Sequence, residues 1–412
     1  MNLYLFNDND SAATFGIGTY LRELTSALKD ANIHIRIVHL HSTRPEFEIM
    51  KVDEIENWHI PMTSSHETFF DGFVQKMEDY YRNVIFLLRL HIKDTTGLIF
   101  HLNFNLCQAL AKGLKTAFKC KTVATIHYIK WQLELHGNLT RFYALLSKPD
   151  DQMSSFETLL KRTDIYKSLL FKGVDRVITL SQNTKKLLYG KYEIDPGKVS
   201  YIPNGLEDVS NAKEDNRDVM RHKWHISEKE LLVVFVGRLH GVKGLTYLIR
   251  SFRKVLEFFP DCRLIIAGSG YYDMYMKDCE GIWATITFTG LLKKRELYEL
   301  YKIADIGVIP SFHEQCSYVA IEMMMHGIPL IASTTTGLKE MVEDGVTGLH
   351  VPVIEYPDRE EIDTELLADK IGYLLQNSKE RKDMGRNARK RYETLYASIM
   401  MRENMLKLYN AL

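Results

Sequence analysis

The sequence has no excess of charge of either sign, because 53 lysines and arginines are matched by 53 aspartates and glutamates among its 412 residues. A general nucleic-acid-binding protein needs a basic surplus to neutralise phosphates, so no nucleic-acid partner is expected. Long hydrophobic runs are also missing. The longest, such as residues 231–237, are far shorter than the ~18–20 residues that span a bilayer, and the first residues lack the pattern of a signal peptide. We therefore expect a cytoplasmic protein whose only membrane contact would be peripheral.

Cysteine is scarce, with five residues that are widely spread and form no C-x-x-C pair. An odd number without metal-ligand spacing argues against a disulfide framework and against a zinc site. The pattern instead predicts reduced, mostly buried thiols. These residues are Cys107, Cys120, Cys262, Cys279 and Cys316.

Short apolar, β-branched runs alternate with amphipathic segments of ten or more residues along nearly the whole chain. This alternation predicts right-handed βαβ units and parallel sheets covered on both faces, so the expected fold class is α/β with doubly wound sheets. The predicted strands are residues 3–6, 34–39, 98–102, 122–126, 176–180, 199–202, 232–236, 263–267, 286–288, 306–309, 330–332 and 349–351.

A domain boundary is predicted after Pro203-Asn204-Gly205, where a polar, charged stretch follows a strand. The boundary divides the chain into near-equal parts, residues 1–205 and 206–391, each long enough for one Rossmann-like unit.

Gly16 and Gly18 follow the first predicted strand and open the first predicted helix. Glycines there let backbone N–H groups approach an anionic ligand at a helix N-terminus. The third glycine of the dinucleotide fingerprint is absent, because Arg22 and Glu23 occupy the candidate positions. A nicotinamide enzyme is therefore disfavoured.

Arg238 and Lys243 lie among glycines directly after the predicted strand 232–236. Open α/β sheets bind ligands at the carboxyl ends of their strands. A guanidinium that bonds two oxygens and an ammonium that acts as a point charge suit a diphosphate. The alternative is a pair of ordinary surface cations.

Glu314 and Glu322 are eight residues apart, the first in a loop after a buried strand and the second within a helix. A rise of ~1.5 Å per residue separates them by at most ~12 Å along the helix axis, which is comparable to a sugar–diphosphate–ribose unit. Ser317 lies between them, and the amides of Tyr318 and Val319 at the helix N-terminus would face a phosphate. Glu322 lies in an otherwise apolar helix and needs a polar partner.

An ordered set of motifs resembles the bacterial retaining glycosyltransferases of family 4, which have the GT-B fold. The motifs are Gly16/Gly18, Ile202-Pro203-Asn204-Gly205, Gly237-Arg238 with Lys243-Gly244, Glu314-x7-Glu322 and Thr347-Gly348-Leu349. The resemblance spans nearly the whole chain. It implies two Rossmann-like domains that face a central cleft, a nucleotide-sugar donor held mainly by the second domain, and a closing segment 392–412 that packs back on the first.

The resemblance also implies a role for each matching residue. Arg238 and Lys243 would hold the diphosphate, Glu322 the ribose, and Glu314 the donor sugar. His127, at the end of a predicted strand, matches a histidine that contacts the donor sugar. A lone histidine at a strand end is more often structural, but beside the other matching motifs the site role is favoured. No cofactor and no metal are expected. Asp8-Asn9-Asp10 is formally a D-x-D metal motif, but it belongs to a different glycosyltransferase fold.

The expected activity is transfer of a sugar by a retaining, metal-independent transferase of the hexosyltransferase type. Gln315-Cys316-Ser317 departs from the small residues that commonly follow the first glutamate, so the donor sugar stays open, as does the base, uracil or guanine. The acceptor is a glycan, a lipid-linked saccharide or a peptide. The peptide is considered because Phe15–Tyr20 and His313–Tyr318 resemble a bacterial subset linked to peptide maturation. The alternatives are another GT-B enzyme, such as a phosphorylase or an epimerase, and a catalytically inert GT-B homologue that serves as a partner subunit.

Overall fold

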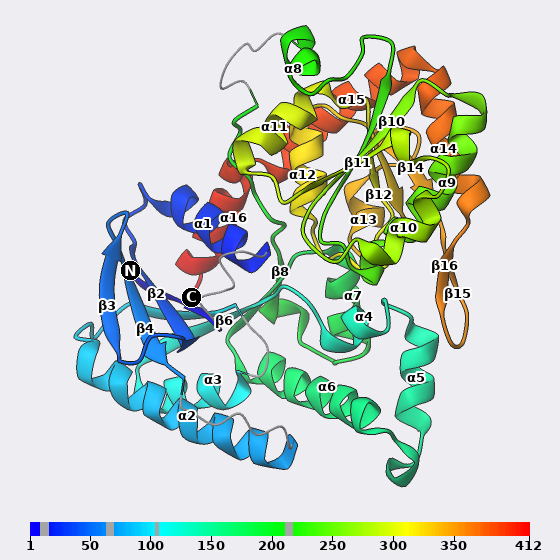
Figure 1. Ribbon diagram of the computed structural model, residues 1–412. Helices are drawn as coiled ribbons and strands as arrows, with labels where there is room; N and C mark the ends of the chain where they lie inside the picture. The colour runs from blue at the N-terminus through cyan, green and yellow to red at the C-terminus, as the bar shows by residue number, and fades with distance from the viewer. Residues whose placement is uncertain (9–15, 63–69, 104–106, 211–216) are drawn as a thin grey trace. The chain divides into compact units, whose positions relative to one another are not determined.

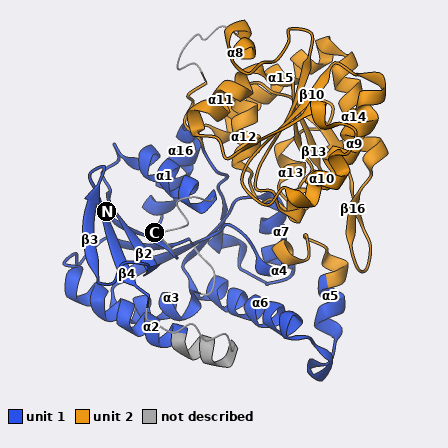
Figure 2. Ribbon diagram, in the orientation of Figure 1, with its two compact units in different colours: residues 1–131, 142–205, 398–412 blue, residues 132–141, 206–397 orange. Residues whose placement is uncertain are grey.

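The computed structural model describes residues 1–8, 16–62, 70–103, 107–210 and 217–412 (Figure 1). The chain forms two compact units (Figure 2). Unit 1 comprises residues 1–131, 142–205 and 398–412, and unit 2 comprises residues 132–141 and 206–397. Each unit contains a mainly parallel sheet with helices on both faces, which confirms the predicted α/β class.

The sheet of unit 1 has the order β3-β4-β2-β1-β5-β6-β7-β8. Every neighbouring pair of its described strands is parallel except the antiparallel pair β3–β4, which the sequence pattern did not predict. β3 is an exposed strand without apolar alternation, so it carries no periodic signal. The strands are β1 (Asn2–Asn7), β2 (His34–Ser42), β3 (Glu48–Val52), β4 (Ile55–Pro61), β5 (Leu98–Leu102), β6 (Cys120–Ile126), β7 (Arg176–Thr179) and β8 (Val199–Tyr201).

A buried chain of polar contacts holds the last helix, α16 (Ser398–Asn410), in unit 1. The hydroxyl of Tyr409 lies 2.7 Å from Nδ1 of His101, whose Nε2 lies 2.6 Å from the hydroxyl of Thr125. Thr125 in turn contacts the hydroxyl of Tyr20. Because buried polar groups need partners, this series of hydrogen bonds fixes the position of α16 within the unit. The other helices of the amino-terminal half are α1 (Gly16–Leu28), α2 (Phe70–His91), α3 (Gln108–Ala117), α4 (Lys130–Glu134), α5 (Leu139–Ser147), α6 (Ser155–Gly173) and α7 (Gln182–Gly190).

The sheet of unit 2 has the order β11-β10-β9-β12-β13-β14, and its described neighbours are all parallel. The strands are β9 (Leu231–Val236), β10 (Cys262–Ala267), β11 (Ile286–Gly290), β12 (Ile306–Ile309), β13 (Leu330–Ser333) and β14 (Gly348–Val351). A separate antiparallel hairpin joins β15 (Val353–Glu355) to β16 (Glu360–Ile362). The helices are α8 (Arg217–Lys223), α9 (Leu245–Phe258), α10 (Asp273–Cys279), α11 (Lys294–Ile303), α12 (Tyr318–Met325), α13 (Leu338–Met341), α14 (Thr364–Gln376) and α15 (Ser378–Arg391).

Helix α9 shows how the sequence pattern builds the core of unit 2. Its buried residues recur at spacings of three and four, so they form one apolar stripe along the helix. The stripe packs in the same cluster as Val233 and Phe235 of β9. The buried apolar residues of the stripe are Leu245, Leu248, Ile249, Phe252 and Val255.

Two segments correct the predicted domain boundaries. Residues 132–141, predicted in the first domain, pack in unit 2, and residues 392–397, predicted to pack back on the first domain, also belong to unit 2. The hydroxyl of Tyr392 donates to the carbonyl of Leu206 at 2.8 Å, and the N–H of Leu206 donates to the carbonyl of Tyr396 at 2.9 Å. These bonds hold residues 392–397 against the start of the second domain. Of the predicted closing segment 392–412, only residues 398–412 therefore belong to unit 1.

No described helix is both long enough and apolar enough to cross a membrane.

Candidate active site

The topology of the sheet in unit 2 brings three loops to one edge. β12 pairs with β9 on one side and with β13 on the other, in parallel. The carboxyl ends of parallel neighbours meet at the same edge, so the segments that follow these three strands lie together. The N–H of Phe312, after β12, donates to the carbonyl of Val242, after β9, at 2.7 Å.

Lys243 and Glu314 form an ion pair at this edge, although 71 residues separate them in the sequence. The hydroxyl of Ser311 donates to the same carboxylate at 3.2 Å. The side chains of Lys243 and Glu314 are 20% and 15% exposed, so the pair is partly withdrawn from water. A partly buried ion pair interacts more strongly than an exposed one, and it leaves both charges within reach of a polar ligand.

Gly244 permits this approach. Its φ of +67° is left-handed, and a Cβ atom there would lie 1.9 Å from the carbonyl oxygen of Pro310. We expect Gly244→Ala to lower the free energy of unfolding by about 2–4 kcal/mol, from backbone strain and overpacking together, as measured by urea denaturation. Gly241→Ala is the matched control, because no heavy atom lies within 4 Å of a Cβ atom at that position. Equal effects of the two substitutions would contradict the close approach.

The loop of residues 311–317 is tied to the end of β13. It is called the donor loop below, because Glu314 was predicted from the sequence to contact the donor sugar. The hydroxyls of Ser333, Thr335 and Thr336 donate to the backbone carbonyls of Ser311, Phe312 and Glu314, respectively. The N–H of Gly337 also donates to the carbonyl of Glu314, at 2.8 Å. The sequence analysis did not single out these residues. The run Ser-Thr-Thr-Thr-Gly directly after a predicted strand is the signal that could have found them.

Helix α12 begins directly after the donor loop. The hydroxyl of Ser317 accepts from the N–H of Ala320, so Ser317 is the N-cap of the helix. The first N–H groups of a helix have no acceptor in a preceding turn, and they make its N-terminus a suitable place for an anion. Tyr318 and Val319 form the start of that first turn, as predicted.

Glu322 of α12 finds its polar partners on α11. The hydroxyl of Tyr301 donates to Oε2 of Glu322 at 3.1 Å, and the hydroxyl of Tyr298 to Oε1 at 3.5 Å. Burial and then the nearby Glu322 carboxylate hold the pKa of Tyr301 well above its usual value, so this hydroxyl stays a donor. The sequence predicted the need for a partner, whereas the tertiary structure supplies two tyrosines that no motif indicated.

His313 is a buried residue to which the sequence analysis assigned no separate role. It is 5% exposed, and neither ring nitrogen has a hydrogen-bond partner among the described residues. Burial, and then the charges of Lys243 and His136, lower the pKa of His313 to about 3. The ring is therefore neutral near pH 7, and it retains a donor and an acceptor for a polar ligand.

Arg238 lies on the same loop as Lys243, between β9 and the short helical turn Gly241–Lys243, and its side chain is exposed. The predicted pair of cations therefore occupies one loop at the carboxyl end of β9. Cys316, in the donor loop, is a buried free thiol, as expected from the sequence.

The remaining predicted residues belong to unit 1. Gly16 and Gly18 lie within the first turn of α1, whereas Phe15, Asn9 and Asp10 lie outside the described residues. His127 follows β6, where its Nε2 lies 3.2 Å from Oδ1 of Asn103.

The ring of His127 packs edge-on against that of Tyr20, with 4.6 Å between the centroids. Burial, and then the neighbouring His101 and Lys167, lower the pKa of His127 to about 3. His127 is therefore neutral near pH 7, so any contact that it makes with a ligand is a neutral hydrogen bond.

No group of three or more His, Cys, Asp or Glu side chains within the described ranges is arranged to hold a metal ion.

Comparisons with known proteins cover both halves of the chain. Residues 216–391 match the family model "Glycosyl transferases group 1", and residues 15–208 match "Glycosyltransferase Family 4". An uncharacterized glycosyltransferase of Methanocaldococcus jannaschii is 35% identical over 183 residues, which are 43% of this chain and 46% of that protein. The chain thus spans about half the length of the curated relatives that it matches.

Solved structures resemble the chain over its full length. Sucrose-phosphate synthase from Thermosynechococcus elongatus has a TM-score of 0.77 and 20% identity, covering 100% of this chain and 98% of that one. HepE of Anabaena, in complex with UDP, has a TM-score of 0.72 and 14% identity, with full coverage of both chains. At these identities the likeness shows the fold alone, which is GT-B.

The two family models together extend over nearly the whole chain, and the fold agrees with them. The predicted resemblance is therefore confirmed at the level of the family. The chain belongs to the family 4 glycosyltransferases of the GT-B type.

Proposed function

We propose that this protein transfers a sugar from a nucleoside-diphosphate sugar to an acceptor, with retention of configuration and without a metal ion. The observation that carries the proposal is the pairing of Lys243 with Glu314 directly before the N-terminus of α12. Cationic, anionic and backbone N–H groups meet there within one unit. A nucleoside-diphosphate sugar presents the complementary groups, an anionic diphosphate beside neutral hydroxyls.

Each group has a separate role in this proposal. Lys243 and Arg238 offset the negative charge that grows on the diphosphate as it leaves, which is the work that a metal ion does elsewhere. Glu314 bonds hydroxyls of the sugar and stabilises its cationic transition state. Glu322, held by its tyrosine partners, binds the ribose. The N-terminus of α12, from Ser317 onward, receives a phosphate oxygen.

No catalytic base is assigned. In the proposed retaining reaction the leaving phosphate takes the proton of the acceptor hydroxyl on the same face of the sugar. His127, neutral near pH 7, donates a hydrogen bond to the donor sugar in this proposal, and the backbone N–H groups of Gly16 and Gly18 bind an anionic group of the donor. The acceptor is a glycan, a lipid-linked saccharide or a peptide.

A thermal-shift experiment on the full chain tests the proposal. UDP, GDP, UDP-glucose and GDP-mannose are each added in the presence of EDTA. We expect the compounds that carry one of the two bases, uracil or guanine, to raise the melting temperature of the protein. A ligand at a hundred times its Kd stabilises the native state by about 2.7 kcal/mol. UDP and UDP-glucose are the first probes, because the structural neighbour HepE was solved with both. The shift should become smaller in Lys243→Ala, because this variant binds the nucleotide more weakly.

The other outcomes distinguish the alternatives. A shift that appears only with added Mg²⁺ would contradict the metal-free part of the proposal. A folded sample that responds to none of the nucleotides would contradict donor binding and favour a catalytically inert GT-B partner subunit.

A further inference from the structure

Residues 132–141 are a segment of unit 2 that the amino-terminal half of the chain contributes. Both residues that flank the segment, Trp131 and Phe142, belong to unit 1. Their rings stack on each other with 4.2 Å between centroids and 15° between planes. The two ends of the segment are therefore held together in unit 1, while its body packs in unit 2.

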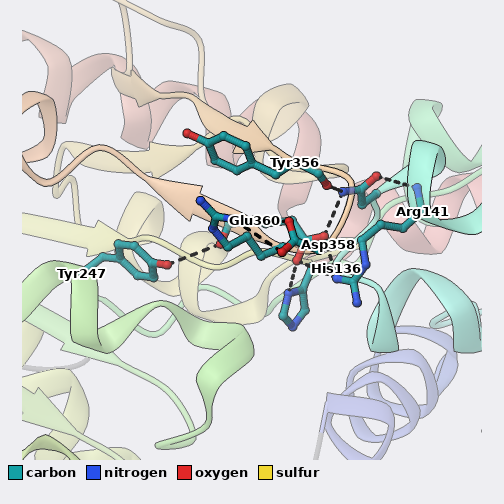
Figure 3. A network of polar contacts seen from close by, with 8 residues as sticks. His136, Arg141, Tyr247, Tyr356, Asp358 and Glu360 are labelled. Carbon is teal, nitrogen blue, oxygen red and sulfur yellow. Dashed lines mark hydrogen bonds and ion pairs between the residues drawn. The ribbon is translucent and has the colours of Figure 1, made fainter.

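Glu360 of β16 anchors the segment (Figure 3). Its carboxylate is only 1% exposed and lies 2.7 Å from Nδ1 of His136 and 2.9 Å from Nη1 of Arg141. Nδ2 of Asn138 donates to the same carboxylate at 2.9 Å and also to the carbonyl of Tyr356 at 2.9 Å. A buried carboxylate is costly unless it is paired and hydrogen-bonded, so these contacts fix the segment against the β15–β16 hairpin.

The anchored segment contacts the donor loop on both sides of Glu314. Nε2 of Gln315 donates to Oε1 of Gln132 at 2.9 Å, and both side chains are buried. The ring of His136 stacks on that of Phe312, with 5.2 Å between centroids and 23° between planes.

Phe312 also connects the segment to α9, the helix that follows Lys243. The ring of Tyr247 packs edge-on against Phe312 at 5.4 Å, and its hydroxyl donates to the backbone carbonyl of Glu360 at 3.3 Å. Phe312 is therefore in contact with His136 and Tyr247, both of which bond to Glu360. One network thus holds residues before and after Glu314 and the helix beside Lys243.

We propose that residues 132–141 form a positioning segment for the donor loop, with Gln132 and His136 as positioning residues that hold Glu314 opposite Lys243. The inference rests on the proposed function for its effect on catalysis. Its structural part does not depend on that function. Contacts on both sides of Glu314 restrict the motion of the loop, so the carboxylate of Glu314 stays oriented toward the donor.

Hydrogen exchange of the nucleotide-free full chain tests the structural part. We expect Gln132→Met to speed exchange of the amides of residues 312–319 about tenfold, the factor that corresponds to one lost buried hydrogen bond. Gln315→Met should have the same effect, and the double variant no more than either one, because all three remove the same bond. Ser154→Ala is the control. It removes the capping box of α6 in unit 1, where Ser154 and Glu157 bond reciprocally, and should leave 312–319 unchanged.

Kinetics then separate positioning from simple stabilisation. With UDP-glucose as the probe, we expect Gln132→Met to lower kcat about tenfold while the Kd for UDP stays within about twofold. A more flexible loop holds Glu314 less often in the orientation that the reaction needs, but it leaves the nucleotide contacts unchanged. Unchanged exchange at 312–319 in folded Gln132→Met and Gln315→Met would overturn the inference. Failure of the wild type to bind UDP, GDP or their sugars would instead contradict the proposed function, and the exchange result would still decide the role of the segment.

Discussion

Glu314→Gln should lower the rate of sugar transfer about 10²–10³-fold, the usual effect of removing one oriented electrostatic group from a transition state. The substitution preserves size and removes charge. The carboxylate forms an ion pair with Lys243, so its loss frees that cation for the diphosphate. We therefore expect the Kd for the nucleoside diphosphate to stay the same or to fall, while kcat falls. Steady-state kinetics and calorimetric titration measure the two effects separately.

Glu343→Gln is the control for this prediction. Glu343 is also a glutamate of unit 2 with a cationic partner, Arg391, but its side chain is 56% exposed. Exposed ion pairs contribute little, so its rate and affinity should match the wild type within about twofold. Near-normal turnover of Glu314→Gln, in a protein that melts at the wild-type temperature, would refute the role assigned to Glu314.

Lys243→Met should have the second large effect. Unlike Glu314→Gln, it should weaken nucleotide binding as well as lower the rate. A hydrogen bond to a charged group contributes about 1.5–3 kcal/mol, so the Kd for the nucleoside diphosphate should rise about 10–150-fold. The rate should fall as well, because the same ammonium offsets charge on the leaving group. Lys243→Arg keeps the charge but presents a planar fork, and we expect it to recover binding better than rate.

The matched control is Lys382→Met, which removes an exposed lysine of α15. It tests whether loss of any one positive charge weakens nucleotide binding, and we expect no change in Kd. Equal losses of nucleotide affinity in Glu314→Gln and Lys243→Met would contradict the separate roles of the two residues.

Much of the fold was predictable because its signals are local. Parallel strands such as β5, β9 and β12 are short apolar runs buried on both faces. Helix α9 has a regular apolar stripe, since burial recurs with the helical period. β3 escaped prediction because it is exposed and unpatterned.

The roles of the site residues remain predictions, but their positions can be compared with the sequence. Glu314, Ser317 and Glu322 lie on one loop and helix, so their spacing alone determined their neighbourhood. The partner of each carboxylate did not follow from spacing. Lys243 reaches Glu314 because the non-consecutive strands β9 and β12 lie side by side, and Tyr301 reaches Glu322 from the preceding helix, α11.

The sequence by itself determined the class of fold, the family and the residues available for chemistry, because each depends on short-range periodicity or on motif order. Only the tertiary structure decided that residues 132–141 pack in unit 2 and contact the donor loop. That placement rests on the burial of Glu360, which requires partners from a segment more than 200 residues earlier in the chain. Such a contact produces no periodic pattern in the sequence, and one buried carboxylate cannot indicate in advance which distant side chains will pair with it.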